Sequence, residues 1–252
     1  MTITLDILDE ILEQVPTNGA GRRNLMACAL VATWWTGPSQ RRLFSSVRID
    51  DRNYERWMNG VVLSGSKTHL LQYVRSLWHS RSHIGTMYQM RDLAQDSGEY
   101  FSALKNLRTL TLFNTRVEKI DEDQFHTCFS AFRETLTYLS LDSFTTSFSA
   151  FVTLLDYFPN ITTLQIRSFT LEPDEGPVPP LSRPLRGKVH IHRIQSSSLE
   201  FLNQFSKLDL EYEELIIDSP SFFMDAKFVE SALKISANTV KFLRLTAALY
   251  CE

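Results

Sequence analysis

Residues 60–68 contain the glycines, lysine and threonine of a phosphate-binding loop, the segment with which many enzymes hold ATP or GTP. That loop needs a lysine directly after its second glycine, so that the ammonium reaches the phosphates. Here Ser66 stands between Gly65 and Lys67, and the preceding residues 52–59 are too polar for the buried strand that leads into such a loop. We interpret the segment as a helix end followed by a turn.

Other candidates for chemistry are equally incomplete. His190 and His192 are two residues apart, so on a strand both imidazoles share one face and could bind a metal, but no third ligand stands at a fixed spacing. The three cysteines, at 28, 128 and 251, have neither metal-site nor disulfide-framework spacing. No nucleophile elbow or paired-histidine zinc motif occurs. We therefore expect a protein that is not an enzyme and has no cofactor and no metal.

The composition narrows the class of partner. The 252 residues include 26 basic and 29 acidic side chains, and the resulting net charge of −3 argues against a dedicated nucleic-acid binder. A hydrophobic content of 43% is enough for a substantial core. Acidic residues replace the basic and apolar stretches of a signal peptide, and no apolar run reaches the ~20 residues that span a bilayer. We expect a location in the cytoplasm, the nucleus or both.

One short frame recurs along the chain: an apolar residue, two others, an apolar residue, one other, and a third apolar residue. It begins as Leu107-Arg-Thr-Leu110-Thr-Leu112, and its fourth position falls at residues 110, 139, 164, 189, 215 and 243. The spacings are 29, 25, 25, 26 and 28 residues. Because side chains two residues apart on a strand point to one face, each copy predicts a short strand with one buried side.

Between these frames the apolar spacing becomes helical. The expected helix stripes are Phe125, Phe129 and Phe132; Phe148, Phe151, Leu155 and Phe158; Leu199, Leu202 and Phe205; and Met224, Phe228, Ala232 and Ile235. Residues 172–184 hold five of the nine prolines and predict a loop. A strand and a helix every ~20–29 residues are typical of leucine-rich repeats, which stack into a solenoid. We expect about six units, the last without a cap.

The first fifty residues follow a different pattern. Ile7, Leu8, Ile11, Leu12 and Val15 predict one apolar helix face, and residues 25–35 are uncharged and apolar nearly all round. A helix of the second kind needs cover on two sides. The chain behind it supplies one side, and the other must come from a partner or from another part of this protein; we favour a second polypeptide.

Residues 3–12, 25–35 and 41–47 together resemble an F-box, most closely in fungal F-box proteins that carry leucine-rich repeats. The resemblance implies a three-helix F-box that binds a Skp-type adaptor and, through it, a cullin–RING ubiquitin ligase. Carried over by position, it implies these adaptor-binding residues: Ile3, Ile7, Leu8, Ile11, Leu12, Leu25, Leu30, Val31 and Trp35.

The sequence therefore predicts an α/β chain with an F-box over 1–50, a linker or capping segment over 51–73, and a leucine-rich-repeat solenoid over 74–252. The outward positions of its strands would bind a protein substrate. The residues predicted for this role are Tyr138, Asp142, Arg167, Lys188, His190, His192, Glu214 and Arg244. The predicted function is the substrate-recognition subunit of a Skp–cullin–F-box ubiquitin ligase. The alternatives are a leucine-rich-repeat scaffold outside the ubiquitin system and, if residues 60–68 bound a nucleotide, an enzyme.

Overall fold

The structure is a computed structural model, and it describes most of the chain. The described residues are 5–80, 82–83, 86–89, 98, 100–117, 122–174, 178–192, 198–208, 210–219, 230, 233–234 and 240–247. The predicted adaptor contact Ile3 and the four residues of the last predicted helix stripe (Met224, Phe228, Ala232 and Ile235) lie outside them.

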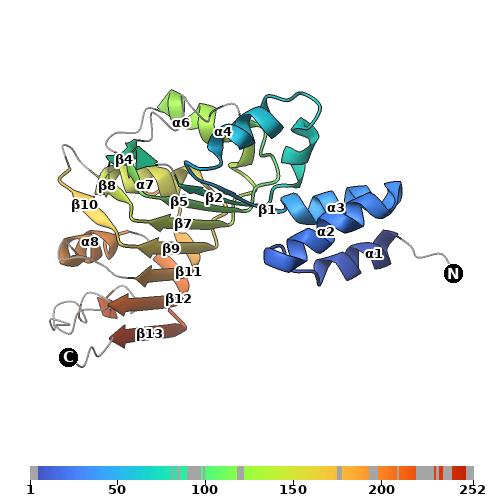
Figure 1. Cartoon of the computed structure of the whole chain (residues 1–252). Helices are drawn as coiled ribbons and strands as arrows, with labels where there is room; N and C mark the ends of the chain where they lie inside the picture. Colours follow the sequence, from blue (N-terminus) through green and yellow to red (C-terminus); the bar gives the residue numbers. More distant parts are fainter. Residues whose placement is uncertain are drawn as a thin grey trace, which may run out of the picture.

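The main sheet has eight strands that lie side by side in chain order, each parallel to the next (Figure 1). They are β1 (Ser46–Ile49), β2 (Ser76–Ser80), β5 (Thr109–Phe113), β7 (Tyr138–Asp142), β9 (Thr163–Arg167), β11 (Leu185–His192), β12 (Leu210–Ser219) and β13 (Phe242–Ala247). The six strands expected from the recurring frame are confirmed. The strands β1 and β2 extend the same sheet toward the N-terminus.

A second sheet has five short strands, in the order β10-β8-β6-β4-β3. They are β3 (Ser82–His83), β4 (Thr86–Gln89), β6 (Thr115–Val117), β8 (Thr145–Ser147) and β10 (Thr170–Glu172). Asn114, Ser143 and Ser168 connect main-sheet strands to these short strands, and each has a positive φ, which turns the chain sharply. The amides of these three residues donate to carbonyls of Asp142, Arg167 and His192 on the next main strand. Successive corners are thereby joined across the sheet.

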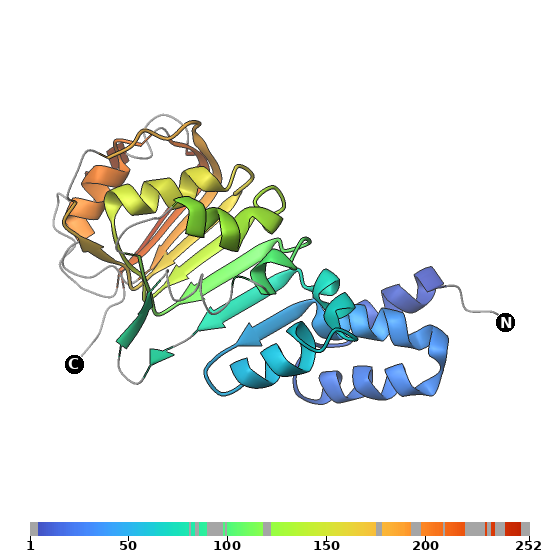
Figure 2. The ribbon, with the colours of Figure 1, turned by 90° about the horizontal axis from the view of Figure 1, so that it is seen from above.

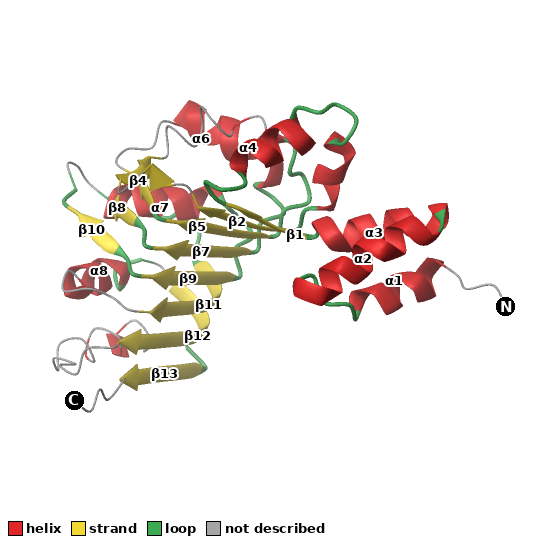
Figure 3. Ribbon diagram, in the orientation of Figure 1, coloured by secondary structure: helices red, strands yellow, loops and turns green. Residues whose placement is uncertain are grey.

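Helices cover one face of the main sheet, and a separate helical group stands beside β1 (Figures 2 and 3). The group comprises α1 (Leu5–Glu13), α2 (Gly19–Val31) and α3 (Thr33–Phe44). The other helices are α4 (Tyr54–Trp57), a π-helix (Met58–Val62), 3-10 helices (Thr68–Tyr73 and Ser130–Phe132), α6 (Glu122–Phe129), α7 (Phe148–Tyr157) and α8 (Ser198–Phe205). The helices expected around Phe125–Phe132, Phe148–Phe158 and Leu199–Phe205 are confirmed.

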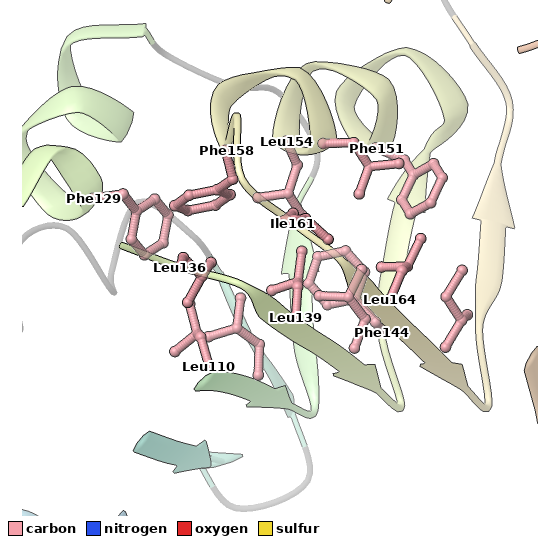
Figure 4. Close-up of a cluster of buried hydrophobic side chains, with 14 of the residues drawn as sticks. Leu110, Phe129, Leu136, Leu139, Phe144, Phe151, Leu154, Phe158, Ile161 and Leu164 are labelled. Carbon is pink, nitrogen blue, oxygen red and sulfur yellow. The ribbon is translucent and has the colours of Figure 1, made fainter. Parts of the chain in front are cut away.

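One continuous apolar core lies between the main sheet and these helices. Strand residues two apart, such as Leu110 with Leu112 and Leu139 with Leu141, are fully buried beneath it. Phenylalanines fill the space above them, and Figure 4 shows Phe129, Phe151 and Phe158 directed toward the strand leucines. The core needs both layers, because the helices cover the strand side chains and the sheet covers the helix side chains.

The predicted fold class, a three-helix F-box followed by a leucine-rich-repeat solenoid of about six units, is wrong. The structure is an α/β fold built on a parallel sheet of eight strands with helices packed against it. Two features separate it from the prediction. The main sheet already begins at Ser46, within the range assigned to the helical domain, and a second sheet occupies segments for which no strand was expected.

Gly187 supplies a test of the main sheet. It has a φ of +100° at the point where the register between β11 and β12 shifts, and a Cβ added there would lie 2.1 Å from the Thr162 carbonyl oxygen. Gly187→Ala is expected to lower the free energy of unfolding by about 1–3 kcal/mol, because alanine disfavours this backbone and meets a carbonyl that cannot move cheaply. Urea denaturation measures the loss. Gly60→Ala, which meets no atom within 4 Å, is the control, and equal stability of the two variants would contradict the account.

Candidate protein-interaction surfaces

The helical group α1–α3 has a small apolar core of its own. Leu8, Leu12, Leu25 and Leu43 are buried in it, and Trp35 packs against them together with the residues Val15, Cys28 and Phe44. Four residues predicted to bind an adaptor, Leu8, Leu12, Leu25 and Trp35, thus hold the three helices together. Their effect on any partner is indirect, since they fix the positions of exposed neighbours.

Two arginines of α3 fix α1 in place. The Arg41 guanidinium forms an ion pair with Asp9 at 2.8 Å. Arg42 Nη2 donates to the Glu13 carbonyl oxygen at 2.8 Å, and so satisfies an acceptor at the C-terminal end of α1 that the helix leaves unpaired. The positive charge also lies at the negative end of the α1 dipole. Together with the buried Leu8 and Leu12, these contacts set which face of α1 turns toward α3.

Apolar side chains that this core does not use are exposed around the junction of α2 and α3. We call Met26, Leu30, Val31 and Trp34 the α2–α3 patch; Leu30 is 87% exposed and Val31 71%. The uncovered apolar surface expected over residues 25–35 is therefore present. The single helix expected there is not: Ala32 is extended (φ −156°, ψ 153°), so α2 ends at Val31 and α3 begins at Thr33.

Trp34 is fixed by its neighbour in the chain. Its ring meets the Trp35 ring edge to face, with centroids 5.5 Å apart, and Trp35 is anchored in the core. Met26 and Leu30 are four residues apart on α2 and so lie on one face. Neither Met26 nor Trp34 was among the predicted contacts, although this spacing could have indicated Met26. On α1, the predicted contacts Ile7 and Ile11 are also half-exposed.

The face of the main sheet opposite the helices carries the second surface. Strand pairing places every second residue of each strand in continuous rows across the sheet. The middle row is Arg48, Trp78, Thr111, Ser140, Gln165, His190, Ile216 and Arg244. All eight residues predicted to bind a substrate lie on this face, in three adjacent rows. The inward-facing leucines alternate with them, as the pattern of the recurring frame predicts.

Charges on this face are largely paired with one another. Lys188 Nζ lies 2.9 Å from Glu214 Oε2, His190 Nε2 lies 3.5 Å from the other oxygen of the same carboxylate, and His192 Nδ1 lies 2.7 Å from Asp218 Oδ2. The hydrogen bond between Lys188 and Glu214 raises the pKa of the lysine and lowers the pKa of the glutamate. The basic stretch expected at the centre of the face is therefore compensated by the carboxylates beside it.

Gln165, on β9, contacts polar side chains of β7, β9 and β11 on this face. Its amide nitrogen donates to the Tyr138 hydroxyl and its oxygen accepts from Arg167 Nη2 at 2.8 Å, in the orientation that satisfies both amide atoms. The same amide lies 3.3 Å from His192 Nε2. Burial raises the pKa of Tyr138, against the opposing effect of Arg167, so its hydroxyl stays protonated while it accepts from the Gln165 amide nitrogen. These contacts order the side chains before any partner binds.

His192 makes the stability of this face depend on pH. Burial lowers its pKa below the ordinary value of 6.5, with Arg167 and His190 acting in the same direction and Asp218 opposing them. The unfolded chain therefore takes up the proton first as the pH falls. The contribution is complete above about pH 6.5 and is lost as the pH falls through the lower, folded-state pKa.

Replacing His192 by asparagine should accordingly flatten the decline in the free energy of unfolding between about pH 6.5 and pH 5. Urea denaturation of both proteins across this range measures the difference in slope. Parallel curves for the two proteins would show that His192 titrates alike in the folded and unfolded states.

An aromatic group occupies the N-terminal end of the same face. The Arg48 guanidinium carbon lies 3.8 Å from the centre of the Trp78 ring, and the Trp78 and Phe113 rings are 5.5 Å apart. None of the three was among the predicted contacts. Phe113 follows the frame as an outward residue, so strand periodicity could have indicated it. The neighbouring positions of Arg48 and Trp78 depend on the pairing of β1 with β2.

Residues 60–68 adopt the helix end and turn that we expected. The π-helix Met58–Val62 leads into a turn with Gly65 at a φ of +56°, and Thr68 Oγ1 donates back to the Gly65 carbonyl. Within the described parts of the chain, no three metal-ligating side chains gather into a possible ion site. No helix in those parts is long and apolar enough to cross a bilayer.

Comparisons of the chain with models of known protein families, with curated proteins and with solved structures found no match. The resemblance of the first fifty residues to an F-box therefore stays a prediction, and the assignment of function rests on the two surfaces described above.

Proposed function

We propose that this protein is a non-catalytic subunit that joins two other proteins. The α2–α3 patch docks one of them, and the solvent face of the main sheet holds the other. A Skp-type adaptor of a ubiquitin ligase is our candidate for the first partner, and a protein destined for ubiquitination is our candidate for the second.

The observation that carries this proposal is the exposure of the α2–α3 patch on a helical group that already has its own core. Four large apolar side chains are exposed on either side of the break between α2 and α3. Exposed apolar clusters of this kind mark sites of protein–protein contact, and tryptophan is over-represented among the residues that dominate such contacts.

The resemblance of residues 3–12, 25–35 and 41–47 to F-box sequences supplies the identity of the first partner. Of the contacts it implies, Ile7, Ile11, Leu30 and Val31 are exposed and available. The other described contacts act through the core of the helical group. Such a ligase operates in the cytoplasm and nucleus, which agrees with the location expected for this chain.

The main sheet supports the role of the second partner. Its solvent face combines the aromatic group at β1–β5 with ordered, compensated charges on β9–β12. Polar side chains that are already fixed lose little entropy when a protein binds, and this favours specific recognition. The proposed mechanism is proximity: a bound protein is held at high effective concentration near an enzyme that other subunits supply.

Size-exclusion chromatography of the full chain mixed with a purified Skp-type adaptor tests the proposal. We expect the two proteins to co-elute as one complex. A Trp34→Ala variant should co-elute less, because the ring is half-exposed and its loss leaves the core of the helical group in place. Separate elution of adaptor and folded wild-type chain would overturn the assignment of the adaptor.

A further inference from the structure

A cavity of about 390 Å³ lies between the helical group and the segments that lead into β2, β5 and β7. Residues of α1 and α3 form one wall, and the segments ending at Arg75, Arg108 and Thr135 form the other. Its volume falls in the range of ~300–1,000 Å³ typical of small-ligand sites. The proposed function makes no use of this cavity.

Positive charge dominates its lining. Four arginines (Arg41, Arg42, Arg75 and Arg108) face two acidic residues, Asp9 and Glu13. Arg41 is paired with Asp9, and Arg42 is held by the carbonyl oxygens of Glu13 and Val15. No carboxylate in the described part of the chain forms an ion pair with Arg75 or Arg108. Two guanidinium groups are therefore left to interact with whatever enters.

The backbone keeps these two arginines adjacent. The amides of Arg108 and Thr109 donate to the Arg75 carbonyl oxygen at 2.8 and 2.9 Å, so the two side chains start from neighbouring strands at one end of the sheet. Like charges side by side are unfavourable unless an anion lies between them. A planar guanidinium offers paired donors that match the oxygens of a phosphate group.

We infer that this cavity binds a phosphate monoester, with Arg75 and Arg108 contacting the phosphate oxygens and Arg42 adding long-range positive charge. The space is larger than one phosphate group and can hold part of the molecule that carries it. This inference does not depend on the adaptor, because Arg75 and Arg108 lie outside the helical group and no residue of the α2–α3 patch lines the cavity.

Titration of the full chain with inorganic phosphate, followed by 31P NMR at constant ionic strength, tests the site. We expect a saturable shift of the phosphate signal. Each of Arg75→Gln and Arg108→Gln should weaken binding about ten-fold or more, because each removes charge-assisted hydrogen bonds. Arg56→Gln makes the same charge change at an exposed arginine outside the cavity and should leave binding unaltered. Far-UV circular dichroism confirms that each variant is folded.

Two further probes, N-acetylphosphoserine amide and glycerol 3-phosphate, show which kind of molecule carries the phosphate. Tighter binding of the first assigns the site to a phosphorylated protein side chain, and tighter binding of the second assigns it to a small metabolite. A wild-type titration without saturation, or equal affinity in wild type and in the Arg75→Gln, Arg108→Gln double variant, would overturn the inference. Adaptor binding measured on the same double variant reports on the proposed function separately.

Discussion

Replacing Leu30 and Val31 together by aspartate is expected to weaken adaptor binding by at least about 100-fold. Burying a large apolar side chain contributes ~1.5–3 kcal/mol, so two contribute ~3–6 kcal/mol, and each 1.4 kcal/mol is a factor of ten. A carboxylate buried without a partner costs more still. Isothermal titration calorimetry with the purified adaptor measures the loss.

The fold should tolerate this double variant, because both side chains are mostly exposed and contribute little to the core of the helical group. Its unfolding midpoint in urea should match the wild type. Leu63→Asp places one such charge on another exposed leucine, outside the α2–α3 patch, and should bind the adaptor normally. Wild-type affinity in the Leu30→Asp, Val31→Asp variant would show that the adaptor binds elsewhere or not at all.

Phe151→Ala is expected to lower the free energy of unfolding by about 3–5 kcal/mol. Phe151 is fully buried, and its ring lies 5.4 to 6.2 Å from the rings of Phe148, Phe169, Phe201 and Phe205. It joins α7 to α8 and to Phe169, which lies between β9 and β10. The cavity left by its removal cannot close without moving two helices, so the loss should approach the upper end of this range.

Urea denaturation followed by circular dichroism measures this loss. Phe242→Ala is the matched control, because Phe242 is about half-exposed on β13 and its removal should change stability by less than about 0.5 kcal/mol. A loss below about 1 kcal/mol for Phe151→Ala would contradict the arrangement of the core between helices and sheet.

Periodicity predicted the main strands because burial follows it closely. In the frame around Leu110 and Leu112, the apolar residues are fully buried and the residues between them are partly exposed. A strand has only two faces, so alternation alone determines which side chains point to the core. The phenylalanine stripes predicted α6 and α7 for a similar reason, since each presents one continuous face to the sheet.

The fold class could not be predicted from the same pattern. The three-residue strands β6, β8 and β10 are too short to show alternation, and they form only because Asn114, Ser143 and Ser168 turn the chain at matching positions. The pairing of β1 with β2 depends on strand contacts between residues 30 positions apart, which no local pattern records. The repeat spacing revealed where strands occur but did not determine how many sheets they build.

In the helical group too, local sequence patterns did not determine which residues form the candidate docking surface. The sequence identified an apolar helix face over residues 7–15 and an apolar segment over residues 25–35, but it could not say which apolar residues fill the core and which remain exposed. That division depends on how α1 and α2 pack against α3, and the contacts of Arg41 and Arg42 with α1 help to set it. As a result Leu8 and Trp35 are structural, whereas Trp34 and Met26 were missed.

Hydrogen–deuterium exchange of the full chain with and without the Skp-type adaptor tests whether the α2–α3 patch is the docking site. We expect the adaptor to slow amide exchange in the C-terminal half of α2 and the first turn of α3, around Leu30, Val31 and Trp34. Exchange in the main sheet should stay the same. Protection confined to the sheet, or no protection anywhere at a saturating adaptor concentration, would contradict this docking site.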